Sequence, residues 1–207
     1  MRDLLAAYYG QRRGWDVLPS GYRRVSYLRS TGMQYIDTGV PGFQPLRLCA
    51  TVSFLGFSAP QTQGLGNQSG KQCRCAIGVV GDRFFAGFGS VNHVSYFYLG
   101  LDTKYTMVAD AISGRCSCND YSYEATGSFI GSTVHLSLFT RSNDIRDNPC
   151  RNMRLYSATI DSGSERLREF IPCVRTQDGK PGMYDTVTDA FFTNRGTSDF
   201  LTPEDNP

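Results

Sequence analysis

Residues that usually carry catalysis are scarce in this chain of 207 residues. The two histidines, His93 and His135, stand in unrelated contexts, and neither belongs to a Ser-His-Asp or Cys-His order that matches a known triad. The four glutamates include no Glu-x-Asp-x-x-Glu arrangement on one strand, although glycosidases need two acids beside the scissile bond. We therefore expect no enzymatic activity, and a glycoside hydrolase is the least favoured alternative.

Long apolar runs and strong charge asymmetry are absent as well. No apolar run approaches the roughly 18 residues of a membrane span. The stretch "MRDLLAAYYGQRRGW" has neither the apolar core nor the cleavage site of a secretion signal. The net charge is +2 with acids and bases interspersed, which is not the basic stripe of a nucleic-acid binder. We expect neither membrane nor nucleic acid as a partner, and a protein made in the host cytoplasm without a signal peptide, as virion components are.

The seven cysteines form no compact disulfide framework, so we expect them to be mainly reduced. Two Cys-x-Cys pairs, Cys73/Cys75 and Cys116/Cys118, raise the alternative of a zinc site with four thiolates. Residues i and i+2 of a strand lie about 6.6 Å apart, which is wide for two ligands of one tetrahedral metal. A cross-strand disulfide is a further alternative, and buried thiols acting as small apolar residues are the favoured one.

Tyrosine, phenylalanine and glycine are abundant, a composition that favours strands and tight turns. Leu46–Phe57 shows strict alternation, because every second residue from Leu46 to Phe54 is apolar. Short strands with turn signals every 8 to 12 residues predict an all-β fold, an antiparallel two-sheet sandwich. The other expected strands are Tyr22–Arg29, Lys71–Val80, Arg83–Gly89, Lys104–Ile112, Thr133–Arg141 and Asn152–Ile160, followed by "RLREFIPC" and "DAFFTNRG".

The segment Ser30–Val40, "STGMQYIDTGV", contains two Thr-Gly steps around a short apolar run. We interpret Gly32 and Gly39 as turn positions with positive φ that bracket a strand from Met33 to Thr38. Asp37 and Thr38 are then expected to fix the following turn through hydrogen bonds from side chain to backbone. This segment is predicted to be framework rather than a site.

Residues 1–17 are predicted to form an arm outside the sandwich. Residues 3–12 suit a short helix with Leu5, Tyr8 and Tyr9 on one face, and this face must pack on its own domain or on a neighbouring subunit. The candidate anchor residues are Leu4, Leu5, Tyr8, Tyr9 and Trp15. The predicted domain organisation is an arm at 1–17, a sandwich at 18–202 and a loose tail at 203–207.

Two further sets of residues are candidates for binding. Tyr96 and Tyr98 share one strand face, as do Tyr121 and Tyr123, and each pair suits either packing or a platform for sugar or protein. The loop "SNDIRDN" gathers oxygen ligands at Asn143, Asp144 and Asp147. Calcium takes six to eight such ligands, so this loop is either a calcium site or a solvated polar turn. No other cofactor is expected.

The two ends of the chain carry motifs that resemble a known family. Leu18–Val40 and Met153–Phe200 are similar to the opening and the end of concanavalin A-like, laminin-G-type jelly-roll domains of bacteriophage and prophage proteins. The matching motifs are Arg154-Leu155-Tyr156, Phe170-Ile171-Pro172-Cys173, Gly182-Met183-Tyr184-Asp185 and Phe191-Phe192-Thr193-Asn194-Arg195-Gly196-Thr197. The usual Gly-Thr-Gly is Gly-Thr-Ser here, and the region 57–150 shows no recognisable motif. The resemblance implies a two-sheet sandwich whose first and last strands lie side by side, and it implies no catalytic residues.

These observations lead to two functional hypotheses. The first is a non-enzymatic virion structural protein, a capsid decoration or a tail-fibre module, which contacts other virion proteins or copies of itself and adheres to glycans. The second is a carbohydrate-binding lectin or receptor-binding module of a bacterial or prophage surface protein. Fold similarity alone does not decide between them.

Overall fold

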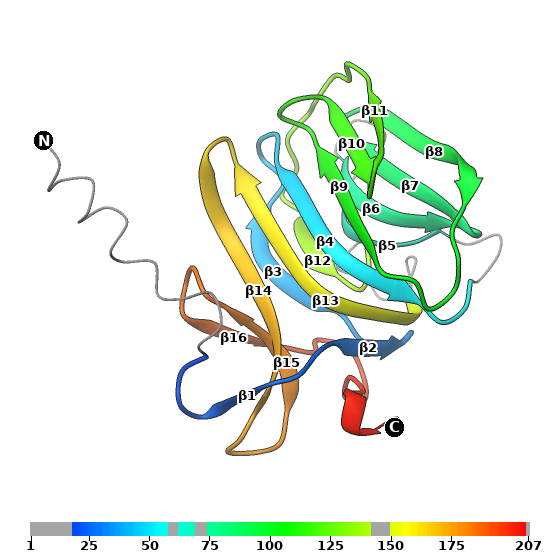
Figure 1. Ribbon diagram of the computed structural model, residues 1–207. Helices are drawn as coiled ribbons and strands as arrows, with labels where there is room; N and C mark the ends of the chain where they lie inside the picture. The colour runs from blue at the N-terminus through cyan, green and yellow to red at the C-terminus, as the bar shows by residue number, and fades with distance from the viewer. Residues whose placement is uncertain (1–17, 58–61, 69–73, 142–149, 206–207) are drawn as a thin grey trace, which may run out of the picture.

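The structure, a computed structural model, describes residues 18–57, 62–68, 74–141 and 150–205. Two antiparallel sheets pack face to face as a β-sandwich of jelly-roll type (Figure 1). The described residues include one short 3₁₀ helix, η1 (Pro203–Asp205), and none of them forms a helix long and apolar enough to span a membrane. The expected all-β fold class is confirmed.

The larger sheet has ten strands in the order β11-β10-β9-β4-β13-β14-β15-β16, with β1 paired to β14 and β2 paired to β13. The two long central strands, β13 and β14, form its longest hairpin. The bounds are β1 (Tyr22–Arg24), β2 (Leu28–Thr31), β4 (Arg47–Phe54), β9 (Tyr105–Asp110), β10 (Arg115–Cys118), β11 (Tyr121–Glu124), β13 (Arg151–Ser162), β14 (Glu165–Arg175), β15 (Pro181–Asp185) and β16 (Ala190–Thr193).

The smaller sheet has six strands in the order β3-β12-β5-β6-β7-β8, so that β3 and β8 are its edges. Its strands are β3 (Ile36–Pro41), β5 (Thr62–Gln68), β6 (Arg74–Val80), β7 (Arg83–Phe88), β8 (Val91–Tyr98) and β12 (His135–Leu138).

The core lies between the facing sides of the two sheets. In β4 the alternate residues Leu48, Ala50, Val52 and Phe54 are buried, as the sequence pattern predicts. The smaller sheet contributes alternate residues of β6 and β7, including Ile77 and Phe84, to the same apolar cluster. Strand period therefore accounts for the buried face of β4, whereas in β6 and β7 the intervening residues, such as Ala76 and Phe85, are buried as well.

The predicted single strand Tyr22–Arg29 is wrong in one respect, because it is two strands. β1 pairs with β14 while β2 pairs with β13, so the chain changes partner between Arg24 and Leu28. Val25 still donates its amide to the carbonyl of Pro172 at 3.1 Å. An alternating sequence cannot reveal such a change of partner, since the alternation continues through it.

The first and last strands, β1 and β16, do not pair with each other in the way that the resemblance implies, because β1 pairs with β14 and β16 with β15, but the two ends of the sandwich meet in one bridge. Arg29 and Leu201 form an antiparallel bridge, with reciprocal backbone hydrogen bonds of 2.8 and 3.0 Å. Within the segment predicted to be a loose tail, Pro203–Asp205 form η1, and Glu204 is paired with Arg23.

The two turns predicted within the segment Ser30–Val40 are present. Gly32 and Gly39 have φ values of 99° and 68°, a region that favours glycine. The carboxylate of Asp37 accepts a hydrogen bond from the amide of Gly39 at 2.9 Å, and the hydroxyl of Thr38 accepts one from Val40 at 3.2 Å. The strand begins later than expected, at Ile36, and runs on to Pro41.

Candidate functional site

The four tyrosines predicted as binding residues lie on two edge strands of different sheets. Tyr96 and Tyr98 are on β8, the edge of the smaller sheet, and Tyr121 and Tyr123 are on β11, the edge of the larger sheet. Both edges lie on the same side of the sandwich, at the end far from β1 and β2 (Figure 1). The fold therefore brings together two segments that are separated by the β9–β10 hairpin.

His93 connects these two edges. Its ring stacks on Tyr123 with 3.9 Å between centroids and an interplanar angle of 11°. Its Nε2 is also hydrogen bonded to the Tyr121 hydroxyl at 2.8 Å. No local sequence pattern groups His93 with residues 121 and 123, because the contact depends on how the two sheet edges meet.

Three of the predicted tyrosines gather around this histidine. Tyr96 lies at a right angle to Tyr121, with 5.8 Å between ring centroids, and is 80% exposed. Tyr98 is also exposed, at 72%, but makes no ring contact with the other tyrosines in the part of the chain that the structure describes. We call His93, Tyr96, Tyr121 and Tyr123 the aromatic surface.

Phe97 and Phe84 support the aromatic surface from below. The ring centroid of Tyr121 is 4.9 Å from that of Phe97 and 6.4 Å from that of Phe84, both in edge-on geometry. Phe84 is fully buried in the core. The exposed rings thus stand on rings that are fixed by core packing, which holds their orientation before any ligand arrives.

The protonation states of His93 and Tyr121 favour hydrogen bonds between uncharged groups. Burial lowers the pKa of His93, so the neutral imidazole, with one donor and one acceptor, is favoured. Burial likewise raises the pKa of Tyr121, which keeps its hydroxyl protonated. Flat apolar ring faces bordered by hydroxyl and imidazole groups match a sugar ring, which has an apolar C–H face and a hydroxyl rim.

The β8 edge lacks the usual protection of an edge strand. Its eight residues, Val91–Tyr98, contain no Lys, Arg, Asp, Glu or Pro. Natural edge strands are commonly shielded by charges, prolines or short length, and β11 and β16 are indeed short at four residues each. An edge strand that is uncharged, aromatic and exposed is typical of a surface that contacts a ligand or another protein.

Other predicted site residues are placed differently or lie outside the described residues. The calcium candidates Asn143, Asp144 and Asp147 lie outside them, as do the anchor candidates Leu4, Leu5, Tyr8, Tyr9 and Trp15.

Cys75, Cys116 and Cys118 are buried free thiols, and Cys73 lies outside the described residues. Burial raises the pKa of Cys75 and Cys118 to about 12, so both stay protonated. Among the described residues no group of three or more His, Cys, Asp or Glu side chains is arranged to hold a metal ion.

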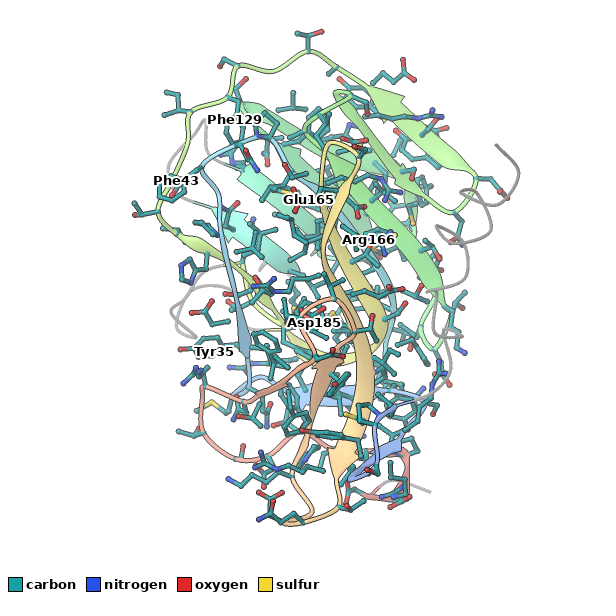
Figure 2. The ribbon with its side chains drawn as sticks, turned by 90° about the vertical axis from the view of Figure 1, so that its left-hand side faces the viewer. Tyr35, Phe43, Phe129, Glu165, Arg166 and Asp185 are labelled. Carbon is teal, nitrogen blue, oxygen red and sulfur yellow. The ribbon has the colours of Figure 1, made fainter. Side chains whose placement is uncertain are left out.

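Two shallow hollows flank the sandwich. One, of about 190 Å³, lies between the β7–β8 turn and the β9–β10 turn and is lined by residues such as Phe88, Ile112 and Phe129. The other, of about 200 Å³, lies beside Lys180 and Asn194 near the end of the chain. Phe43 and Phe129 lie along one rim of the molecule (Figure 2), and Phe43 is strongly exposed. The hollow beside Phe129 is lined by apolar and small polar residues, and the hollow beside Asn194 includes Lys180 and Asp199.

Comparison with known proteins gives little similarity. No family model matches the chain, and no curated protein matches it. One solved structure, a mutant of Trypanosoma rangeli sialidase displaying trans-sialidase activity, aligns with a TM-score of 0.40 and 13% identity. The alignment covers 67% of this chain and 27% of that chain, so this chain spans well under half of that protein. A likeness of this strength does not establish a shared fold and does not bear on activity.

Proposed function

We propose that this chain is a non-enzymatic, concanavalin A-like binding module of a bacteriophage particle, and that its aromatic surface adheres to glycans. The observation that carries the proposal is the aromatic surface itself, which joins the open edges of both sheets and is supported by core rings. The motifs at both ends of the sequence support the phage assignment, since they resemble jelly-roll domains of phage proteins. Other virion proteins, or further copies of this chain, are the proposed attachment partners.

The glycan part of the proposal predicts a specific loss of binding on Tyr96→Ala. The Tyr96 ring is mostly exposed and takes no part in the core, so its removal should leave the fold intact. One ring stacked on a sugar contributes about 1 to 1.5 kcal/mol, so affinity should fall roughly fivefold to tenfold. Binding would be measured on an array of neutral oligosaccharides with and without calcium, followed by calorimetry on the best ligand.

Tyr98→Ala is the matched control for this experiment. Tyr98 lies on the same strand and is similarly exposed, but the described residues place it outside the ring contacts of the aromatic surface. Its substitution should change affinity by less than about twofold, since no stacked ring is lost. An array without any ligand, or equal losses for both substitutions, would refute the glycan proposal.

The alternative is a lectin or receptor-binding module of a bacterial or prophage surface protein that uses the same aromatic surface. The two candidates differ in where the protein is found and in the role of residues 1–17. A virion protein should copurify with particles and lose incorporation when residues 1–17 are deleted, while the remaining sandwich stays soluble. Normal incorporation of the truncated chain would contradict an anchoring arm, and absence from purified particles would favour the alternative.

A further inference from the structure

Two arginines face each other across neighbouring strands of the larger sheet. Arg154 on β13 is the direct antiparallel partner of Arg29 on β2. Residues in such positions have Cα atoms about 4.5 to 5.5 Å apart and side chains on the same face. Like charges directly opposite are destabilising, so this pairing needs an explanation.

The two arginines are unequally compensated. Arg154 is paired with the carboxylate of Asp102 and lies over the ring of Tyr27, with Cζ 4.8 Å from the centroid. Arg29 donates from Nη2 to the neutral amide oxygen of Asn152 at 3.3 Å, and it has no carboxylate partner among the described residues. The positive charge of Arg29 is therefore not offset.

Lys104 adds a third cation to the same patch. Its Nζ lies 4.3 Å from the centroid of Tyr156, whose ring is edge-on to Tyr27 at 5.7 Å. The hydroxyl of Tyr156 is held by Ser53 at 3.0 Å. We call Arg29, Lys104 and Arg154 the arginine–lysine cluster. Against its three cations stands Asp102, whose side chain is 66% exposed and well screened by water.

The acceptors that hold the two arginines come from unusual backbone positions. Asp102 has a φ of 54° and Asn152 a φ of 55°, both in the left-handed region. Asn152 also lies at an irregularity in the β13–β2 register, between Arg151 and Arg154. Bulges and left-handed residues are concentrated at functional sites, where they re-aim side chains. Here they place one acceptor beside each arginine.

We propose that the arginine–lysine cluster binds one compact oxyanion group, a carboxylate, sulfate or phosphate, between Arg29 and Arg154. A guanidinium offers a planar fork of donors that matches the oxygen atoms of such groups. Because Arg29 and Arg154 are direct partners on adjacent strands, the cluster suits a single small anion, whereas a nucleic-acid polymer needs a long row of cations. This site stands independently of the aromatic surface and of its proposed neutral ligands. If the anion is carried by a sugar, the ligand is an acidic glycan.

The proposal is tested by calorimetry and thermal shift on the full chain. The probes are sodium phosphate, sodium sulfate and sodium acetate against sodium chloride at equal ionic strength. Galacturonate and galactose 6-sulfate are compared with galactose. The oxyanions should raise the melting temperature and bind measurably, whereas chloride and galactose should not. Tighter binding of the acidic sugars than of the free ions identifies a glycan-borne group, and equal binding identifies a site for the free anion.

Three substitutions make this test specific. Arg29→Gln and Lys104→Gln should each weaken oxyanion binding at least fivefold. Arg154→Lys, which keeps the charge but not the fork, should weaken it by a smaller factor. Arg115→Gln is the control, because Arg115 is an exposed cation of the same sheet paired with Glu124, outside the cluster. Absence of oxyanion binding, or equal binding by the Arg29→Gln variant and the unsubstituted protein, would overturn the proposal.

Discussion

Arginine side chains gather at both ends of β13, but their electrostatic surroundings are opposite. Near its last residues, Asp161 pairs with Arg166 and also with Nη1 of Arg47 at 3.0 Å. Asp110 and Glu169 lie 4.0 and 3.7 Å from the same two arginines. Near its beginning, Arg154 faces Arg29. Figure 2 shows Glu165 and Arg166 at the β13–β14 hairpin, above Asp185 in that view. One end is an ion-pair network that joins four strands, β4, β9, β13 and β14, and the other end has an excess of positive charge.

The carboxylates around each arginine distinguish an arginine with a structural role from a candidate binding arginine within the same sheet. Around Asp161 three carboxylates surround two guanidinium groups, so no further anion is needed. Around Arg29 the nearest acceptor is neutral. Both sets contribute to packing through their apolar stems, so exposure alone would not have distinguished them.

The largest expected effect is on the balanced end. Asp161→Ala leaves two half-buried arginines without their shared partner, whose side chain is only 12% exposed. The free energy of unfolding should fall by about 2 kcal/mol, since loss of hydrogen bonds to a charged group and residual desolvation both contribute. Urea denaturation measures this change.

Asp102→Ala is the matched substitution at the other end of β13. Asp102 is mostly exposed, so the loss of its ion pair, together with the strain of alanine at a φ of 54°, should cost about 1 kcal/mol. It should also strengthen oxyanion binding at the arginine–lysine cluster, because it removes the competing carboxylate. Equal destabilisation by Asp161→Ala and Asp102→Ala would remove the distinction between the two ends.

A smaller effect is expected when the unbalanced end loses a charge. Arg29→Gln removes one of two facing cations and keeps a polar group beside Asn152. The unfolding free energy should therefore change by less than about 0.5 kcal/mol, in either direction, in the absence of oxyanions. A loss comparable to that of Asp161→Ala in urea denaturation would show that Arg29 is structural.

The smallest effect concerns the aromatic surface, which contrasts with both charged regions because it contains no charge at neutral pH. Burial lowers the pKa of His93 below its ordinary value of 6.5, so the unfolded chain takes up a proton first as pH falls. The stabilising effect of neutral His93 is complete above pH 6.5 and is lost as pH falls through the lowered folded value. Acid should slightly lower the melting temperature.

His93→Phe checks this pH dependence. Phenylalanine keeps a ring for stacking on Tyr123 but cannot titrate, so the difference in melting temperature between variant and wild type should change between pH 7.5 and pH 5. The other groups around the ring, Tyr121 and Phe84, carry no charge in this range. Parallel melting curves at both pH values would contradict the prediction.

Sequence patterns predicted the framework well and the contacts between distant segments poorly. The alternation in β4, the glycine turns at Gly32 and Gly39 and the all-β class follow from local rules that need only neighbouring residues. The split of Tyr22–Arg29 into two strands depends on which strand each half joins, and that choice is made by the rest of the sheet.

The candidate sites show the same division. Tyr96, Tyr121 and Tyr123 could be chosen from the sequence because tyrosines alternate on two short strands, but their union with His93 requires two sheet edges to meet. The facing of Arg29 and Arg154 could not be predicted at all. The two residues are far apart in sequence, and their register follows from an irregularity at Asn152.

The bridge between Arg29 and Leu201 joins the first and last parts of the sandwich at one end of the molecule. Because the chain enters and leaves at this end, while β8 and β11 lie at the other (Figure 1), a tether at residues 18 and 202 would hold the aromatic surface outward. A force that pulls these two ends apart would act on the β1–β14 pairing and on the Arg29–Leu201 hydrogen bonds, both of which lie at the end opposite the aromatic surface.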